Sequence, residues 1–262
     1  MSYINNYIDQ INKRNRKALS IFLTAGFPSK NNFVDLAKSV LDSGADLFEL
    51  GIPFSDPLAD GPTIQASSKA ALDNGVTLKD VFQYSHEISS YSPKPIVLMG
   101  YANPIKKYGI KNFLTDAYNS GAKGLIVPDI PINEYDSFFE YGSEQLEVIL
   151  LTTPTSPEER IKSIDEKSSG FVYCVSIVGT TGVQDTFSVE TIDNIKRTRT
   201  IVKKNKMLIG FGISKPEHIK TFSPYCDGVI VASAVIKSIL NKESKSETLK
   251  IISSLSDACN SL

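Results

Sequence analysis

The stretch from Leu19 to Gly51, LSIFLTAGFPSKNNFVDLAKSVLDSGADLFELG, contains the unit from which the rest of the chain is built. Its two ends, Leu19–Thr24 and Asp46–Gly51, are nearly continuous apolar runs, which is typical of parallel strands covered on both faces. Between them, five apolar residues recur at the spacing of one helix stripe: Phe33, Leu36, Ala37, Val40 and Leu41. Gly44 follows as a suitable helix cap. The stretch therefore predicts a strand, a helix and a second strand.

The same unit recurs along the chain. Six further apolar runs alternate with segments of helical period: Ile96–Tyr101, Gly124–Asp129, Val148–Thr152, Phe171–Ser176, Met207–Phe211 and Gly228–Ala232. Eight units in 262 residues favour a closed barrel over an open doubly wound sheet, and no run is followed by the G-x-G-x-x-G dinucleotide fingerprint. We therefore predict an α/β fold, a single (β/α)8 TIM barrel with extra helices that occupies residues 1–262 as one domain.

Composition argues against several classes of partner. The 28 basic and 29 acidic residues nearly cancel, which gives no electrostatic reason to expect nucleic acid or an anionic membrane. The N-terminus lacks a secretory signal, and no window has membrane-spanning length. Cys174, Cys226 and Cys259 have no C-x-x-C spacing, which indicates a reducing compartment rather than a disulfide framework or a zinc site. We expect a cytoplasmic protein.

Glu49 is the most informative residue of the second strand. Alternation along the strand places Leu47, Glu49 and Gly51 on one face, with Phe48 and Leu50 on the other. If the bulky pair faces the helices, Glu49 points into the mouth of the barrel. Burial raises the pKa of a carboxyl group, so Glu49 is a candidate acid or base near neutral pH. A glutamate in a structural salt bridge is an equally good reading of position alone.

The loop after this strand carries a second candidate carboxylate, Asp60. It stands beside Gly61 and Pro62, just before a predicted helix, so it could serve as a cap or turn residue. Functionally, two carboxylates in different surroundings are a common way to divide acid and base roles. The spacing alone does not decide between these interpretations.

Glycine-bearing loops suggest a phosphate site on the other side of the mouth. Gly210–Ser214 closes the seventh strand and Val231–Ala234 the eighth, while Gly179–Gly182 follows the sixth. Backbone N–H groups of such loops, with a helix N-terminus, form the recurrent phosphate site of these barrels. Any one of the loops could simply make a tight turn. All three together favour a phosphorylated ligand.

Other chemistries find little support in the sequence. His86 and His218 lie in predicted helices, and no His, Asp and Glu cluster has metal-ligand spacing. No lysine ends a strand, which disfavours a Schiff-base aldolase. The remaining prediction is acid–base chemistry by carboxylates, with no metal, on a phosphorylated substrate.

The uninterrupted run Glu49–Gln65, ELGIPFSDPLADGPTIQ, closely resembles the signature of the tryptophan synthase alpha chain family. The resemblance extends over essentially the whole chain, through these segments: Thr24–Pro28, Tyr101–Pro104, Val127–Pro131 and Gly210–Ile213. It implies retro-aldol cleavage of indole-3-glycerol phosphate to indole and glyceraldehyde 3-phosphate. Glu49 would be the acid–base group, and Asp60 would stabilise the indole N–H as positive charge develops there.

The resemblance also implies binding residues. The indole ring would lie among Phe22, Met99, Tyr101, Ile126, Tyr173 and Phe211. The phosphate would be held by Gly182, Gly212, Ala232 and Ser233. Thr181 would belong to a closing loop that touches Asp60. Without the resemblance, barrel packing is the simpler interpretation of the apolar residues.

Three positions depart from the family pattern. Ile177 stands where arginine is usual, Ala232 where glycine is usual and Pro128 where alanine is commoner. Ile177 makes no charged contact, so loop closure and coupling to a partner are expected to differ. Ala232 keeps its backbone N–H but adds a Cβ near the phosphate. None of the three removes a catalytic group.

The family works as an α2β2 complex with a beta subunit, which carries the pyridoxal phosphate; no cofactor is expected in this chain. By resemblance, the docking surfaces are Pro53–Asp60 and Asn103–Tyr108. The alternatives are a stand-alone indole-3-glycerol-phosphate lyase, a subunit that mainly activates its partner, and another phosphate-binding barrel such as a sugar phosphate isomerase. Retention of Glu49 and Asp60 argues against the second, and the apolar pocket against the third.

Overall fold

The strands of the chain close into a parallel barrel in sequence order. The structure, a computed structural model, describes residues 2–140, 145–176 and 187–260. Its strands are β1 (Ala18–Thr24), β2 (Leu47–Gly51), β3 (Ile96–Met99), β4 (Gly124–Ile126), β5 (Glu147–Thr152), β6 (Phe171–Val175), β7 (Lys206–Gly210) and β8 (Gly228–Val231). Each pairs with the next, and β8 pairs with β1. The predicted (β/α)8 barrel is confirmed.

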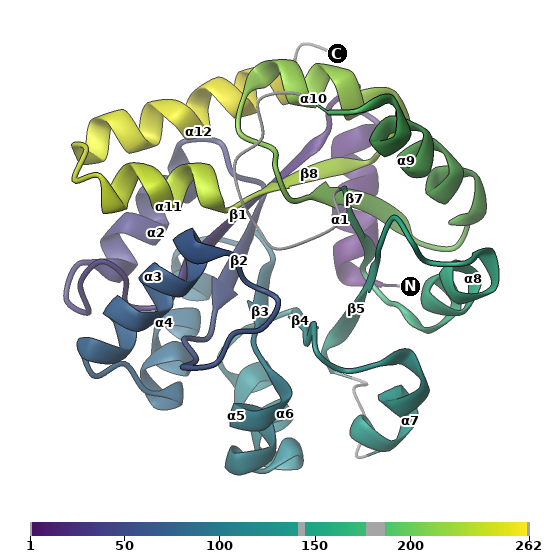
Figure 1. The fold of residues 1–262 in the computed structure, drawn as a ribbon. Helices are drawn as coiled ribbons and strands as arrows, with labels where there is room; N and C mark the ends of the chain where they lie inside the picture. The colour runs from purple at the N-terminus through teal and green to yellow at the C-terminus, as the bar shows by residue number, and fades with distance from the viewer. Residues whose placement is uncertain (1, 141–144, 177–186, 261–262) are drawn as a thin grey trace.

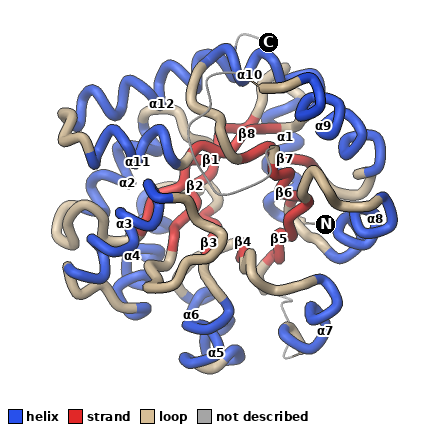
Figure 2. The backbone as a smooth tube through the Cα atoms, in the orientation of Figure 1, coloured by secondary structure: helices blue, strands red, loops and turns tan. Residues whose placement is uncertain are grey.

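The helices form a ring outside the strands, as Figure 2 shows in blue around red. They are α1 (Tyr3–Asn12), α2 (Phe33–Asp42), α3 (Pro62–Asp73), α4 (Leu78–Tyr91), α5 (Ala102–Tyr108), α6 (Ile110–Asn119), α7 (Tyr135–Phe138), α8 (Glu158–Lys167), α9 (Val189–Ile201), α10 (Pro216–Phe222), α11 (Ser233–Leu240) and α12 (Lys245–Asn260). Short 3₁₀ turns, η1 (Ile132–Glu134) and η2 (Ser223–Tyr225), adjoin α7 and α10. The helices beyond one per strand are the predicted extra helices.

The apolar core has two layers, because side chains alternate along each strand. Alternate strand residues such as Phe48, Leu50 and Leu98 belong to the outer cluster beneath the helices. Leu47 and Val97 belong to a separate cluster inside the barrel. A strand residue therefore faces either the helices or the barrel interior, and the interior positions near the C-terminal strand ends reach the mouth.

Helix α1, purple in Figure 1, closes the N-terminal end of the barrel. Ile4, Ile8 and Ile11 are buried and join the cluster inside the barrel. Ile4 lies so close to Gly124 at the start of β4 that a Cβ on this glycine would come within 2.8 Å of the Ile4 Cδ1 atom. With α1 packed at this end, the mouth of the barrel lies at the C-terminal ends of the strands, where ligands of such barrels bind.

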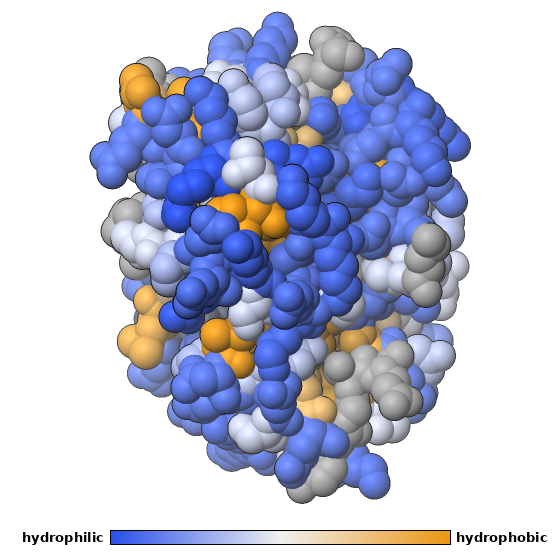
Figure 3. Space-filling model, turned by 90° about the vertical axis from the view of Figure 1, so that its right-hand side faces the viewer, coloured by the Kyte–Doolittle hydropathy of each residue, from blue (hydrophilic) through white to orange (hydrophobic). Residues whose placement is uncertain are grey.

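The outer faces of the helices are largely polar. Figure 3 views the side that carries α8 and α9, which is mostly hydrophilic with separate apolar spots. In α8, the buried residues are Ile161, Ile164 and Asp165. None of the helices that the structure describes combines the length and apolar character needed to span a membrane.

Candidate active site

Strand β2 directs Glu49 into the barrel. Its neighbours Phe48 and Leu50 pack in the outer layer, whereas Leu47 packs inside, so the strand alternates as predicted. Glu49 is level with Phe22 of β1 and retains 1% of its exposure. The carboxyl group therefore lies in the barrel interior, below the mouth.

Burial dominates the electrostatics of Glu49. It raises the pKa of this carboxyl from 4.5 to about 7, while a hydrogen bond from Ser20 acts in the opposite direction. The Ser20 hydroxyl donates to Oε1 at 2.8 Å, and Oε2 is buried without a hydrogen-bond partner among the described residues. No cation of the described ranges forms a salt bridge with Glu49, so the structural ion pair considered above is not observed there.

Asp60 reaches the same region from the loop between β2 and α3. Gly61 is the N-cap of α3, so Asp60 does not cap this helix. The Asp60 side chain is buried and bonded to the Tyr101 hydroxyl. Burial raises its pKa to about 6, and the bond with Tyr101 opposes that rise. The loop is held in place because Gln65 Nε2 donates to the Asp60 carbonyl at 2.7 Å.

A further clamp fixes the start of this loop. The Ser68 hydroxyl of α3 accepts from Phe54 N at 2.8 Å and lies 3.0 Å from Phe54 O. The Tyr101 hydroxyl accepts from Ala59 N at 3.1 Å. These contacts bind the loop to α3 and to the end of β3, so Asp60 is presented by an anchored segment.

The six predicted indole residues fall into two groups that share Met99. Phe22, Met99 and Tyr101 line a narrow crevice beside Asp60. The other group lies against the inner cluster of the barrel: Met99, Ile126, Tyr173 and Phe211. The rings of Tyr173 and Phe211 meet edge to face with centroids 5.9 Å apart.

Tyr173 links the two carboxylates. Burial raises its pKa well above the usual value, and the charges of Glu49 and Asp60 raise it further. The two carboxylates therefore lie within electrostatic reach of one phenol. This places acid–base groups and aromatic surface in one region at the C-terminal ends of the strands.

A cavity of about 540 Å³ adjoins this region. Its walls come from the loops after β2, β4 and β5, from the ends of β6 and β7 and from α8, and include Ala59, Pro128, Thr153, Val175 and Phe211. Volumes of this order suit small-molecule ligands. Pro128, one of the departures from the family pattern, thus forms part of the cavity wall.

The predicted phosphate residues lie at the ends of β7 and β8. Phe211 and Gly212 have φ angles of 69° and 75°. The left-handed conformation is costly for a bulky residue such as Phe211, and strained backbone of this kind clusters at functional sites. The Phe211 carbonyl accepts from the Ser176 hydroxyl at 2.6 Å, which holds the turn.

The β8 end supplies a helix N-terminus. Ala232 is the N-cap of α11 and Ser233 its first residue. Ala232 has a φ of −125°, which is outside the left-handed region that favours glycine. N–H groups in the first helical turn are available to an anion. The predicted residues Gly182 and Thr181, and the departure Ile177, lie outside the described residues.

Comparison with known proteins settles the family. A family model for the tryptophan synthase alpha chain matches residues 8–260. The chain belongs to this family. The tryptophan synthase alpha chain of Petrotoga mobilis is 44% identical, over 91% of this chain and 93% of that protein. That of Caldanaerobacter subterraneus is 40% identical, over 95% of each.

Solved structures agree with this assignment. A chain of the tryptophan synthase a2b2 complex from the hyperthermophile Pyrococcus furiosus is 40% identical, with a TM-score of 0.85 over 92% of this chain and 98% of that chain. A chain of Mycobacterium tuberculosis tryptophan synthase is 31% identical, with a TM-score of 0.91 over 99% and 98%. The tryptophan synthase alpha fold therefore extends over nearly the whole chain.

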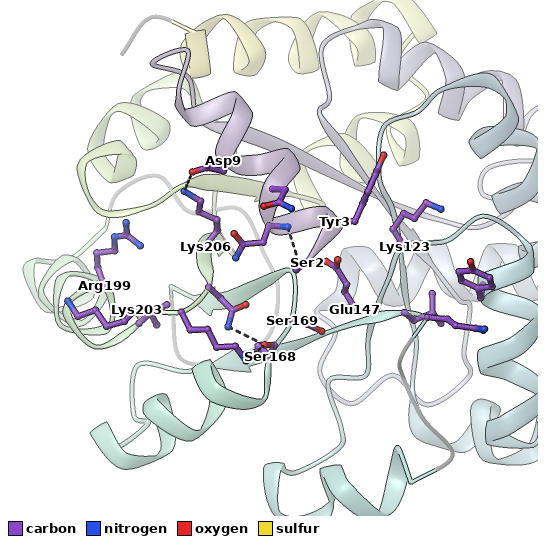
Figure 4. A pocket seen from close by; sticks show the side chains of 18 residues that line it. Ser2, Tyr3, Asp9, Lys123, Glu147, Ser168, Ser169, Arg199, Lys203 and Lys206 are labelled. Atoms are coloured by element: carbon purple, nitrogen blue, oxygen red, sulfur yellow. Dashed lines mark hydrogen bonds and ion pairs between the residues drawn. The ribbon is translucent and has the colours of Figure 1, made fainter.

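A second cavity of this alpha-chain family member, about 1300 Å³, lies at the other end of the barrel. Figure 4 shows the side chains that line it, and a few of them pair with one another, such as Asp9 with Lys206. Lys206 Nζ contacts Asp9 at 2.8 Å, and Glu147 accepts from Ser2 Oγ at 2.7 Å and from Ile4 N at 3.0 Å. These pairs attach α1 to the strands, so the cavity is better explained by stability than by catalysis.

Three residues that support the site were not predicted as site residues from the sequence. Ser20 faces the barrel interior two positions before Phe22, and this spacing was the available signal. His218 lies in α10 as predicted, but its Nδ1 accepts from Ser214 N at 3.3 Å and so supports the turn after β7. Ser68 carried no signal that separates it from an ordinary helix residue. No group of three or more His, Cys, Asp or Glu side chains in the described ranges could hold a metal ion.

Proposed function

We propose that this chain is a tryptophan synthase alpha subunit that cleaves indole-3-glycerol phosphate to indole and D-glyceraldehyde 3-phosphate. The observation that carries the proposal is the buried carboxyl of Glu49, which forms no salt bridge among the described residues, with Asp60 nearby at the ligand end of a barrel of this family. A buried carboxyl destabilises a fold unless it is compensated, so two such groups at one end of the barrel support a role in chemistry.

The reaction needs two proton transfers. Protonated Glu49 gives its proton to indole C3, which leaves positive charge at the ring nitrogen. The carboxylate so formed takes the proton of the hydroxyl group on the side-chain carbon that is bonded to indole C3, and this carbon becomes the aldehyde carbon. The electrons of the broken C–C bond return to the ring, and indole leaves with its new hydrogen on C3. Glu49 ends as it began.

The pKa values of the two carboxyl groups support this division of roles. With a pKa of about 7, Glu49 is present in both protonation states near neutral pH, which suits a group that donates and then accepts. With a pKa of about 6, Asp60 is mostly ionised there and can stabilise the positive charge on the ring nitrogen. Burial is the main cause of both shifts, and the lower ordinary pKa of aspartate, 3.8 against 4.5, accounts for much of the remaining difference.

We place the indole against the two groups of side chains that Met99 joins, and the phosphate at Gly212, Ala232 and Ser233. Gly182 and Thr181 are proposed to complete the site by the family pattern. The crevice beside Asp60 and the cavity bounded by Phe211 supply the apolar surface. The turn after β7 and the N-terminus of α11 supply N–H groups.

The proposed partner is a tryptophan synthase beta subunit in an α2β2 complex, as in the Pyrococcus furiosus relative. Pyridoxal phosphate would belong to the beta subunit. We assign docking to the segments Pro53–Asp60 and Asn103–Tyr108, and Leu58 in the first retains 86% of its exposure. The three cysteines are free and buried, which supports a cytoplasmic enzyme.

The test follows indole release from indole-3-glycerol phosphate, with and without a beta subunit, by fluorescence. The chain has no tryptophan, so it adds no tryptophan background. We expect slow release alone, a sharp increase with the beta subunit, and a loss of at least about 100-fold in kcat for both Glu49→Gln and Asp60→Asn.

Each other outcome points elsewhere. Fast release that the beta subunit does not change would indicate the stand-alone lyase. Absence of release by the wild-type chain under both conditions would contradict the catalytic proposal. Full activity in Glu49→Gln would remove Glu49 from the reaction while leaving the family assignment intact.

A further inference from the structure

Ser20 is an unusual residue for its position. It belongs to β1, is fully buried, and faces the barrel interior with Phe22. A hydroxyl group there is costly unless it forms a hydrogen bond. Its bond partner is Oε1 of Glu49 at 2.8 Å. An interior position of the barrel is therefore occupied by a polar residue that contacts the central carboxyl group of the site.

The strand register shows from which side Ser20 acts. Glu49 is level with Phe22, and Ser20 is level with Leu47, one interior position closer to the end that α1 closes. Ser20 thus holds the carboxyl group from the floor of the barrel. The other oxygen, Oε2, is buried and has no hydrogen-bond partner among the described residues.

We propose that Ser20 is a positioning residue: its hydroxyl holds Oε1 of Glu49 and leaves Oε2 as the oxygen that exchanges protons with the substrate. Oε2 gives its proton to the ring carbon and accepts the hydroxyl proton afterwards, while Oε1 keeps its bond to Ser20. The assignment rests on the proposed function for the substrate, but the Ser20–Glu49 contact stands on its own geometry.

The contact also has a predictable electrostatic consequence. A donor to a carboxylate favours the ionised form, so Ser20 lowers the pKa of Glu49 against the effect of burial. Of the other ionisable groups, Tyr173 of β6 and Asp60 face this region, and neither is a cause of the Glu49 shift. The level neighbours on β1 and β3, Phe22 and Val97, do not ionise. Ser20 is thus the main group that opposes burial.

The test titrates Glu49 directly by ¹³C NMR of side-chain carboxyl groups in the full chain, with Glu49→Gln to assign the signal. In Ser20→Ala we expect the midpoint to rise by about one pH unit, because a hydrogen bond to a charged group is lost. Ser20→Thr keeps a hydroxyl and should restore the wild-type midpoint. Ser85→Ala, which removes a fully buried hydroxyl from α4, is the matched control and should change nothing.

A kinetic arm tests the positioning. With a beta subunit present, Ser20→Ala should lose about tenfold in kcat with KM unchanged, since a misplaced catalytic group costs rate rather than affinity. In the pH profile of kcat for Ser20→Ala, the apparent pKa assigned to Glu49 should rise by the same amount as the NMR midpoint. Should Ser20→Ala not fold, Ser20→Cys keeps the volume with a weaker donor and should give a smaller shift in the same direction.

The outcomes are separable. An unchanged Glu49 midpoint in Ser20→Ala, or a change of equal size in Ser85→Ala, would overturn the role of Ser20 whatever the enzyme does. Absence of indole release by the wild-type chain would instead contradict the proposed function, and the NMR midpoint would still decide whether Ser20 controls Glu49.

Discussion

Glu49 couples the proposed chemistry to the stability of the barrel. Its pKa is about 7 in the folded chain and 4.5 when solvated, so between these values the folded state keeps a proton that the unfolded state has released. The free energy of unfolding therefore falls as pH rises through this interval. Below pH 4.5 both states are protonated, and above about pH 7 both are ionised, so the contribution is then constant.

Glu49→Gln should remove this dependence. The amide has nearly the same shape and no titration, so the variant should gain on the wild type from pH 4.5 to about 7, by about 3 kcal/mol at the upper end. Urea unfolding of both proteins at several pH values measures the difference. Asp60 and the other ionisable groups titrate in both proteins, so their contributions cancel in the difference between the two free energies of unfolding. Parallel stability curves for the two proteins would show that burial does not penalise Glu49.

Sequence reasoning succeeded and failed at this scale for one physical reason. Alternation along a strand fixes which face a side chain occupies, and this placed Glu49 inside the barrel. It says nothing of contacts between strands, because these depend on register. Ser20 meets Glu49 only because β1 and β2 pair with Phe22 level with Glu49. The contact of His218 with Ser214 likewise depends on how the turn after β7 folds back on α10.

At the scale of elements, all eight strands were predictable but their ends were not. The predicted strands Ile96–Tyr101 and Gly124–Asp129 end at Met99 and Ile126 in the structure. Apolar residues such as Tyr101 and Val127 follow and extend the pattern, yet they belong to loops that build the mouth. Tyr101 begins the turn into α5, and Asp129 accepts from Ala102 N at 3.0 Å. Hydrophobicity marks burial, and here loops as well as strands are buried.

The N-terminus of α11 has a role that one substitution can test. Ser233→Ala removes a hydroxyl from the first residue of the helix but keeps its N–H. The phosphate stays remote from the reacting bond, so its loss should affect ground and transition states alike. We expect KM for indole-3-glycerol phosphate to rise about fivefold to tenfold with kcat unchanged. Ser253→Ala, exposed on α12, is the control. A fall in kcat at constant KM would contradict this role.

The loop after β2 is expected to serve the partner as well as the substrate. Leu58→Ser should weaken binding of a beta subunit by about tenfold or more, because a leucine side chain buried in an interface contributes roughly 1.5–3 kcal/mol. Val189→Ser is a matched control, since Val189 is 75% exposed on α9, away from the proposed docking segments. Titration calorimetry measures both. Equal affinities for Leu58→Ser and the wild type would exclude Leu58 from the interface.

At the scale of the whole molecule, the two ends of the barrel do different work. The C-terminal end carries strained backbone at Phe211 and buried carboxyl groups, both of which cost stability. The N-terminal end carries the plug formed by α1, with Ile4, Ile8 and Ile11 inside the barrel and Glu147 bonded to the start of the helix. Stability gained at one end offsets the cost at the other.

This division predicts that damage to the plug lowers stability without altering catalysis. Ile8 is fully buried among the inner cluster, so Ile8→Ala should lower the free energy of unfolding by about 2–5 kcal/mol, and Ile8→Val by about 1 kcal/mol. Urea unfolding measures both variants. While the protein remains folded, kcat/KM for indole release should stay within about twofold of wild type, because the deleted atoms lie at the end of the barrel opposite Glu49 and Asp60. The opposite result would be a loss of kcat/KM in folded protein that is larger for Ile8→Ala than for Ile8→Val. It would show that packing around α1 affects the active site, so that the two ends of the barrel are coupled.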